Sequence, residues 1–177
     1  GKPDFCLALH TRAELPAGSI GACPGWALAN VDSVDVRVRG QGGHGSTPQL
    51  THDPVVLAAR IVLGLQTIVS REIAPQDPAV ITVGSIHGGT KHNIIPDEVK
   101  LQITVRSYTP EVRQHLLKAI ERTALFEARA AGFPDDLLPE VTLLAEHTPA
   151  LWNDPGIVTR ANAAIARVLG PEAVRPK

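Results

Sequence analysis

One histidine of this sequence stands in a setting that a core-forming segment does not need. His44 lies in the run Arg39-Gly-Gln-Gly-Gly-His-Gly-Ser-Thr-Pro48, where four glycines and a proline surround it. Glycine adopts backbone angles closed to other residues and lets another segment approach the main chain closely. We therefore interpret the loop as presenting His44 for chemistry, although a plain exposed turn and a phosphate-binding loop are alternatives. Neither the P-loop nor the dinucleotide-binding fingerprint is present.

Three further polar residues could contribute to a site. His10 follows an apolar run, at the strand end where open α/β sheets carry ligands, so it could bind a metal or simply end the strand. No second ligand stands at zinc-site spacing from it. Asn93 lies between two expected strands and could hold an amide or carboxylate, or cap a turn. Arg106 could clamp a carboxylate in a bidentate pair, or form a surface ion pair.

The elements that must position these residues follow from hydrophobic periodicity. Strands are predicted at 31–39, 79–86, 99–106 and 141–145, and helices at about 54–71 and 110–131. Asp53 and Thr109, each followed by proline, are the expected helix caps. The apolar face of the first helix is assigned to Val55, Val56, Ala59, Val62, Leu63 and Val69.

The order from 31 to 146 is β-α-β-β-α-β, which predicts an α+β, ferredoxin-like domain. Such a domain has a four-stranded antiparallel sheet with two helices on one face. Outside it, the apolar run at 5–9 predicts a strand buried on both faces, with Cys6 in the core. A third helix is expected between Pro155 and Gly170. We expect a complete domain at about 31–149 and two arms, 1–30 and 150–177, that belong to a larger domain.

Composition excludes several function classes. The 177 residues carry a net charge of −1 with scattered lysines and arginines, which gives no case for nucleic acid or an anionic membrane. Aromatic residues make up 3%, too few for a base-stacking platform. No apolar run reaches the ~18–20 residues of a membrane span. Two cysteines form no disulfide framework, so a reducing cytoplasmic compartment is expected.

Taken together, several motifs resemble one known family across nearly the whole chain. They are Asp4-Phe-Cys-Leu-Ala-Leu-His10, Val38-Arg-Gly-Gln-Gly-Gly-His44, Asp53-Pro-Val-Val, Leu65-Gln-Thr-Ile-Val-Ser-Arg71, His92-Asn-Ile-Ile-Pro-Asp-Glu98, Thr104-Val-Arg106 and Asn153-Asp-Pro155. This sequence is similar to the zinc- or manganese-dependent amidohydrolases of the aminoacylase and carboxypeptidase group, and within it to the hippurate and indole-acetyl-amino-acid hydrolases. In that family, a ferredoxin-like lid that also forms the dimer is inserted into a catalytic domain with two metal ions.

The resemblance implies a role for each candidate residue. His10 would be a metal ligand held by the catalytic domain, and His44 would reach into the partner subunit's site to stabilise the oxyanion. Asn93 and Arg106 match lid positions that contact substrate. The implied reaction is hydrolysis of an N-acyl amino acid by metal-activated water, with a glutamate as general base, in a homodimer.

The sequence also departs from the family pattern. The family's other metal ligands and its catalytic glutamates find no match, so this chain alone is expected to be inactive and to hold no complete metal pair. Thr11-Arg12, Gly45 and Gln49 differ from the residues common at those positions, which bears on substrate preference. The alternative is a non-catalytic ferredoxin-like module that dimerises or binds a small ligand.

Overall fold

The computed structural model describes residues 1–175, and the larger of its two compact units, Leu28–Leu151, is organised around one strand. Strand β3 (Val31–Arg39) pairs in antiparallel register with β7 (Glu98–Arg106) on one side and β8 (Glu140–Thr148) on the other. Strand β5 (Val80–Gly88) extends the sheet beyond β7, giving the order β5-β7-β3-β8. This is the ferredoxin-like topology that the sequence predicts.

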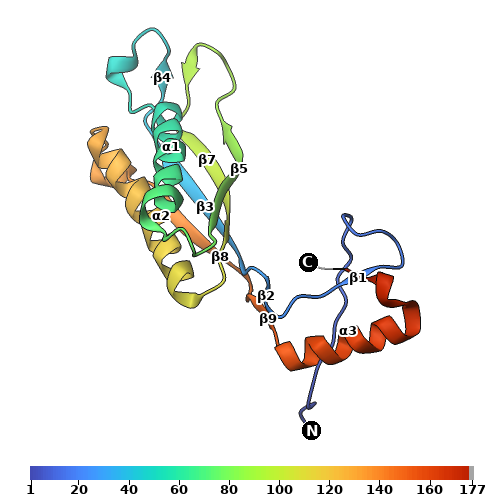
Figure 1. Ribbon diagram of the computed structural model, residues 1–177. Helices are drawn as coiled ribbons and strands as arrows, with labels where there is room; N and C mark the ends of the chain where they lie inside the picture. The colour runs from blue at the N-terminus through green and yellow to red at the C-terminus, as the bar shows by residue number, and fades with distance from the viewer. Residues whose placement is uncertain (176–177) are drawn as a thin grey trace. The chain divides into compact units, whose positions relative to one another are not determined.

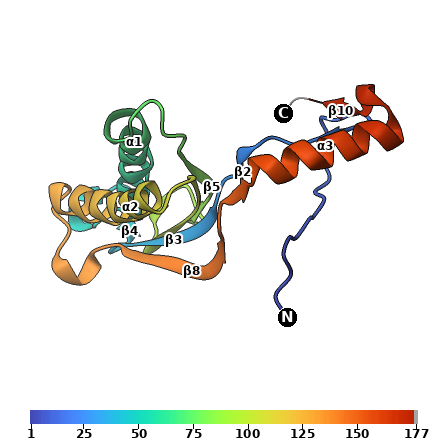
Figure 2. The same cartoon turned by 60° about the horizontal axis from the view of Figure 1, so that its bottom comes forward.

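Two helices cover one face of this sheet, as Figures 1 and 2 show. They are α1 (Pro54–Glu72) and α2 (Pro110–Ala130). The predicted caps are confirmed: the Asp53 carboxylate accepts hydrogen bonds from two backbone N–H groups, and the Thr109 hydroxyl accepts one from Val112. Gly132 follows α2 with φ of 78°, a left-handed conformation that ends the helix.

The core lies between the sheet and these helices. It is built from the alternate, fully buried side chains of β3 and β7 and from one face of each helix. The largest fully buried side chains are Val34, Val36, Val38, Leu57, Ile61, Leu65, Ile68, Val99, Leu101, Val105, Leu116 and Ile120.

The apolar face assigned to α1 from sequence is wrong. The residues that face the core begin at Leu57 and recur at Ile61, Leu65 and Ile68, whereas Leu63 is 71% exposed. Val62 and Val69 of the assigned face lie partly buried at the margin of the core. The helix is apolar on nearly every side, so periodicity alone did not identify which side meets the sheet.

Helix α1 is also long and apolar enough to cross a membrane, judged by length and composition alone. Its fully buried row of side chains instead packs on the sheet of the larger unit. A core helix of a globular domain passes the same test, so this property is weak evidence for a membrane span.

Short elements join the main strands of the larger unit. The segment after β3 contains β4 (Gly43–His44) and the 3-10 helix η1 (Pro48–Leu50). The connection from β5 to β7 contains β6 (Ile94–Ile95), and a second 3-10 helix, η2 (Asp135–Leu137), precedes β8. Of these, β4 and β6 pair with each other and form the candidate site.

The smaller unit combines Gly1–Ala27 with the residues from Trp152 onward. It contains α3 (Pro155–Leu169), which lies between Pro155 and Gly170 as the sequence predicts and is capped by Asp154. The 3-10 helix η3 (Pro171–Ala173) follows. Strands β1 (Ile20–Gly21) and β10 (Val174–Arg175) pair in parallel. Strand β2 (Gly25–Leu28) pairs with β9 (Leu151–Asn153), where the rings of Trp26 and Trp152 meet edge to face at 5.0 Å.

The strand expected at 5–9 does not form among the described residues. This segment has no regular secondary structure, Leu9 is 88% exposed, and Cys6 is exposed rather than in the core. A strand requires a neighbour that satisfies its backbone N–H and C=O groups, and no described strand pairs with this run. The apolar pattern therefore predicted burial, whereas residues 5–9 are exposed in this structure.

Candidate active site

The glycine loop is fixed at its base by backbone hydrogen bonds. Gln41 and His52 exchange two N–H···O bonds of 3.0 Å, which closes the loop. Asp97 binds the loop from the other side, because its carbonyl accepts from Gly40 N–H and its carboxylate accepts from Gly42 N–H, both at 2.8 Å. The segment that carries His44 is therefore anchored to the chain entering β7.

The pairing of β4 with β6 brings two predicted site residues together. His44 lies opposite Ile94, and Gly45 N–H donates to the Asn93 carbonyl at 2.8 Å. His44 and Asn93 are both exposed at this point. In Figure 1, β4 lies beyond one end of the four-stranded sheet. The structure thus brings the main chains of His44 and Asn93 together at the end of the larger unit, where both side chains are exposed.

The loop glycines serve close approach rather than unusual backbone angles. Among the described glycines with positive φ, none belongs to the loop from Gly40 to Gly45, so that part of the sequence interpretation is wrong. A Cβ at Gly40 would stand 2.4 Å from the His52 carbonyl oxygen, and a Cβ at Gly42 would stand 2.4 Å from that of Ile95. The glycines allow the loop, β6 and the start of α1 to lie closer than side chains permit.

The ring of His44 has one close polar neighbour. Its Nδ1 atom lies 2.7 Å from the Ser46 hydroxyl oxygen and accepts a 3.2 Å hydrogen bond from the Ser46 backbone N–H. The His44 carbonyl accepts from the backbone N–H and the hydroxyl of Thr47, at 2.9 and 3.2 Å. Both the main chain and the ring of His44 are thereby held by the two residues Ser46 and Thr47.

Arg106 does not lie near His44 and Asn93. It ends β7, whose first residue, Glu98, pairs with Arg39 at the start of the glycine loop. Eight residue steps at about 3.3 Å each place Arg106 roughly 26 Å along the strand from Glu98. Alternation with the buried Val105 puts Arg106 on the sheet face away from the helices. One copy of this unit therefore does not bring Arg106 and His44 to the same small substrate.

His10 lies in the smaller unit without a metal site around it. It is exposed, and its Nδ1 is 2.6 Å from the Thr11 carbonyl oxygen. Within residues 1–175, no group of three or more histidine, cysteine, aspartate or glutamate side chains is arranged to hold a metal ion. The described residues therefore do not fit a dinuclear metal centre, and any centre that used His10 would need ligands from elsewhere.

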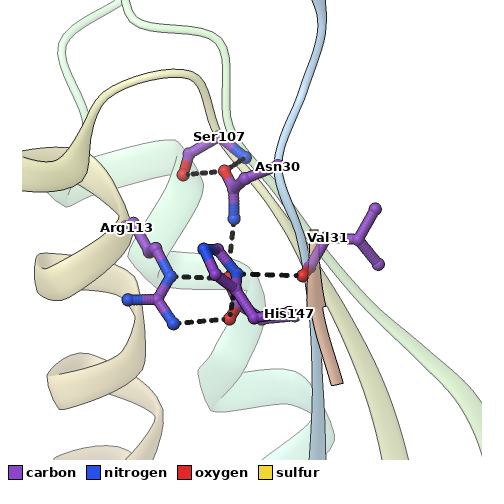
Figure 3. Close-up of polar contacts among 6 residues, drawn as sticks. Asn30, Val31, Ser107, Arg113 and His147 are labelled. Carbon is purple, nitrogen blue, oxygen red and sulfur yellow. Dashed lines mark hydrogen bonds and ion pairs between the residues drawn. The ribbon is translucent and has the colours of Figure 1, made fainter. Parts of the chain in front are cut away.

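A buried polar network that the sequence interpretation missed lies at the opposite end of β3. The Asp32 side chain has no exposed surface and accepts a 2.6 Å hydrogen bond from the Asn30 carboxamide. The guanidinium of Arg113, in the first turn of α2, donates to both Asp32 oxygens at 2.9 and 2.7 Å. His147 Nδ1 lies 3.2 Å from the same carboxylate, and Figure 3 shows these side chains converging.

The same network joins β3 to the end of β7. The Asn30 side-chain oxygen accepts from both the backbone N–H and the hydroxyl of Ser107, at 2.7 and 2.6 Å. A signal for it was present in the sequence, because the alternation that buries Val34 and Val36 also places Asp32 on the buried face. A carboxylate at such a position requires a cationic partner.

This network shifts the pKa of Asp32. Burial alone raises the pKa of a carboxyl group, but hydrogen bonds and the positive charge from Arg113 outweigh it, with smaller contributions from His147 and Asn30. The pKa of Asp32 therefore lies below its ordinary value, and the carboxylate stays ionised at neutral pH.

The sequence of the larger unit matches a known family. The model of the M20 peptidase dimerisation domain matches residues 27–130, which include β3, the glycine loop, β6, β7 and α2. His44, Asn93 and Arg106 all fall inside this match.

Curated relatives extend the comparison. An N-acetyldiaminopimelate deacetylase of Bacillus pumilus is 43% identical over 122 residues, which are 69% of this chain and 32% of that protein. An N-acetylcysteine deacetylase of Bacillus subtilis is 34% identical over 162 residues, 92% of this chain and 41% of that protein. The chain thus spans about a third to two fifths of the length of these relatives.

A solved structure of the same family is also similar to this chain. The Bacillus subtilis YxeP protein, described as a dinuclear metal-binding peptidase of the M20 family, superposes with a TM-score of 0.62 at 28% identity. The match covers 90% of this chain and 37% of that protein.

Proposed function

Because this chain belongs to the M20 peptidase dimerisation-domain family, we propose that it is the lid and dimer-forming part of a metal-dependent amidohydrolase. The amidohydrolase would cleave the amide bond of N-acyl amino acids. The two curated relatives described above are deacetylases of N-acetylated amino acids, which supports this substrate class. Hydrolysis of larger acyl groups, as in hippurate, stays a prediction from the sequence resemblance.

In this proposal, His44 donates a hydrogen bond to the oxyanion that forms on the attacked carbonyl. Its exposed position beside Asn93, on a loop anchored through Asp97 and β6, is the observation that carries the assignment. A donor held in place before the reaction stabilises developing charge without reorganising, which is worth roughly 3–4 kcal/mol. Asn93, at the same end of the unit, would hold the amide or carboxylate of the same substrate.

The distance between Arg106 and His44 favours a site shared between two subunits. We assign Arg106 to the substrate carboxylate, and His44 and Asn93 to the site of the partner subunit. Each substrate would then contact Arg106 from one lid and His44 with Asn93 from the other. The homodimer would be required for activity, because neither copy alone supplies both groups to one substrate.

Two divalent ions, zinc or manganese, would activate the attacking water when bound. His10 would be one ligand, and residues 1–30 and 150–177 would join the lid to the catalytic domain that supplies the others. The chain by itself stays predicted to be inactive, and a cytoplasmic location stays predicted from its two free cysteines.

The test of His44 is its replacement by alanine in the longer enzyme that contains this chain. We expect kcat to fall about 10²–10³-fold, as for loss of one oxyanion donor, with bound metal unchanged. His87→Ala, an exposed histidine on β5, serves as the matched control and should leave kcat unchanged. A normal kcat for His44→Ala would refute the oxyanion role.

The alternative is a non-catalytic module that dimerises through this domain. The absence of a metal-ligand group within residues 1–175 is the observation that favours it. The complete reading frame distinguishes the two, because an enzyme requires further histidine, cysteine and glutamate ligands outside this chain.

A further inference from the structure

Ser46 is the residue whose position the proposed function does not explain. It is exposed, carries no charge, and contacts His44 through two separate atoms. Its hydroxyl oxygen and its backbone nitrogen lie 2.7 and 3.2 Å from the same ring nitrogen of His44, Nδ1. Two donors on one side of an imidazole constrain where the ring can carry its proton.

The backbone contact decides the tautomer. A backbone N–H can only donate, so Nδ1 of His44 must accept and cannot carry a proton itself. A neutral imidazole has one N–H, which must then be on Nε2. The Ser46 hydroxyl, facing an unprotonated Nδ1, donates a second hydrogen bond to it. The ring is left with its N–H on the nitrogen away from Ser46.

The main chain of His44 is fixed independently of this contact. Pairing with Ile94 and two hydrogen bonds from Thr47 to the His44 carbonyl hold the backbone. What remains free is rotation of the ring and the choice of tautomer. The two Ser46 donors constrain both the rotation of the ring and the choice of tautomer, because both contact the ring atom Nδ1.

We propose that Ser46 is a positioning residue that holds neutral His44 in the Nε2–H tautomer and fixes the plane of its ring. This gives the imidazole a ready hydrogen-bond donor for an anionic oxygen. The catalytic meaning of this arrangement rests on the proposed role of His44, but the tautomer itself does not. An imidazole with the proton on Nδ1 would present a lone pair at Nε2 and would repel an oxyanion.

The test is nitrogen NMR of this 177-residue chain with ¹⁵N-labelled histidine. Spectra are recorded at about pH 8.5, two units above the ordinary histidine pKa of about 6.5, so that the rings are neutral. The His44 signals are assigned by their loss in His44→Gln. In the unaltered chain, we expect an unprotonated Nδ1 and a protonated Nε2.

Ser46→Ala removes the hydroxyl and leaves the backbone N–H. The preference for one tautomer should fall about fivefold, the effect of one ordinary hydrogen bond, and the two nitrogen shifts should move toward each other. Ser46→Thr keeps the hydroxyl and should restore the original pattern. Thr47→Val is the matched control, because the Thr47 hydroxyl contacts the His44 carbonyl and not the ring.

Two results would overturn the proposal. One is a protonated Nδ1 in the unaltered chain, and the other is a Ser46→Ala spectrum identical to it. In the longer enzyme, Ser46→Ala should lower kcat about fivefold with rescue by Ser46→Thr. If the tautomer behaves as expected while His44→Ala keeps a normal kcat, the proposed function fails and the assignment of Ser46 stands.

Discussion

The guanidinium of Arg113 donates hydrogen bonds to both carboxylate oxygens of Asp32. This pair connects the first turn of α2 to the N-terminal end of β3. The hydrogen bonds measure 2.9 and 2.7 Å, and the Asp32 side chain has no exposed surface. Removing one partner of such a pair leaves a buried charge without compensation, which costs far more than loss of an exposed pair.

Arg113→Ala should therefore destabilise the larger unit by about 3 kcal/mol, the low end for a buried pair, since Arg113 itself is partly exposed. Chemical denaturation of the purified chain measures the change. Arg122→Ala, on the same helix, removes an exposed pair with Glu72 and should cost no more than about 1 kcal/mol. Equal losses for the two variants would show that the Asp32 pair is not the stronger one.

The lowered pKa of Asp32 predicts a specific pH dependence. A carboxyl group with a lowered pKa in the folded state stabilises the protein fully above its unfolded pKa, about 3.9. That contribution is lost as pH falls through the folded pKa. Below about pH 5, the free energy of unfolding should therefore fall less steeply with decreasing pH for Asp32→Asn than for the unaltered chain. Identical slopes would mean that Asp32 does not titrate below its ordinary range.

Much of the fold could be predicted because its signals are local. The strand at 31–39 has the bounds predicted from alternation, and Asp53, Thr109 and Asp154 cap helices where each precedes a proline. Local periodicity and caps also give the order of elements, from which the sheet topology follows.

The parts that could not be predicted depend on contacts between distant segments. The face of α1 was assigned wrongly because the helix is apolar on several sides, and only the sheet selects the one with Leu57 and Ile61. The run at 5–9 carries a burial pattern without a described strand to pair with it. The proximity of His44 and Asn93 arises from β4–β6 pairing, which spans about 50 residues of sequence and leaves no periodic signal.

The close approach at Gly42 predicts a steric effect on the candidate site. Gly42→Ala places a Cβ 2.4 Å from the Ile95 carbonyl oxygen, which should force β4 and β6 apart and cost about 1–3 kcal/mol. The amide resonances of His44 and Asn93 should shift with it. Gly84→Ala is the control, because a Cβ there meets its nearest atom at 3.8 Å and should change stability by less than about 0.5 kcal/mol.

In the proposed enzyme, each active site takes His44 from one subunit and Arg106 from the other. Two inactive variants of the longer enzyme, His44→Ala and Arg106→Ala, are mixed, dissociated and allowed to reassociate. Half of the dimers are then mixed, and each mixed dimer has one of its two sites intact, so about a quarter of normal activity should return.

The matched control is the mixture of His44→Ala with Asn93→Ala. Both of these residues lie at the same end of one lid, so neither mixed site is complete and activity should stay at the level of the separate variants. We expect activity to recover in the mixture of His44→Ala with Arg106→Ala, and not in the mixture of His44→Ala with Asn93→Ala. If mixed dimers of His44→Ala and Arg106→Ala are shown to form and activity still does not recover, the site is not shared between subunits in this way.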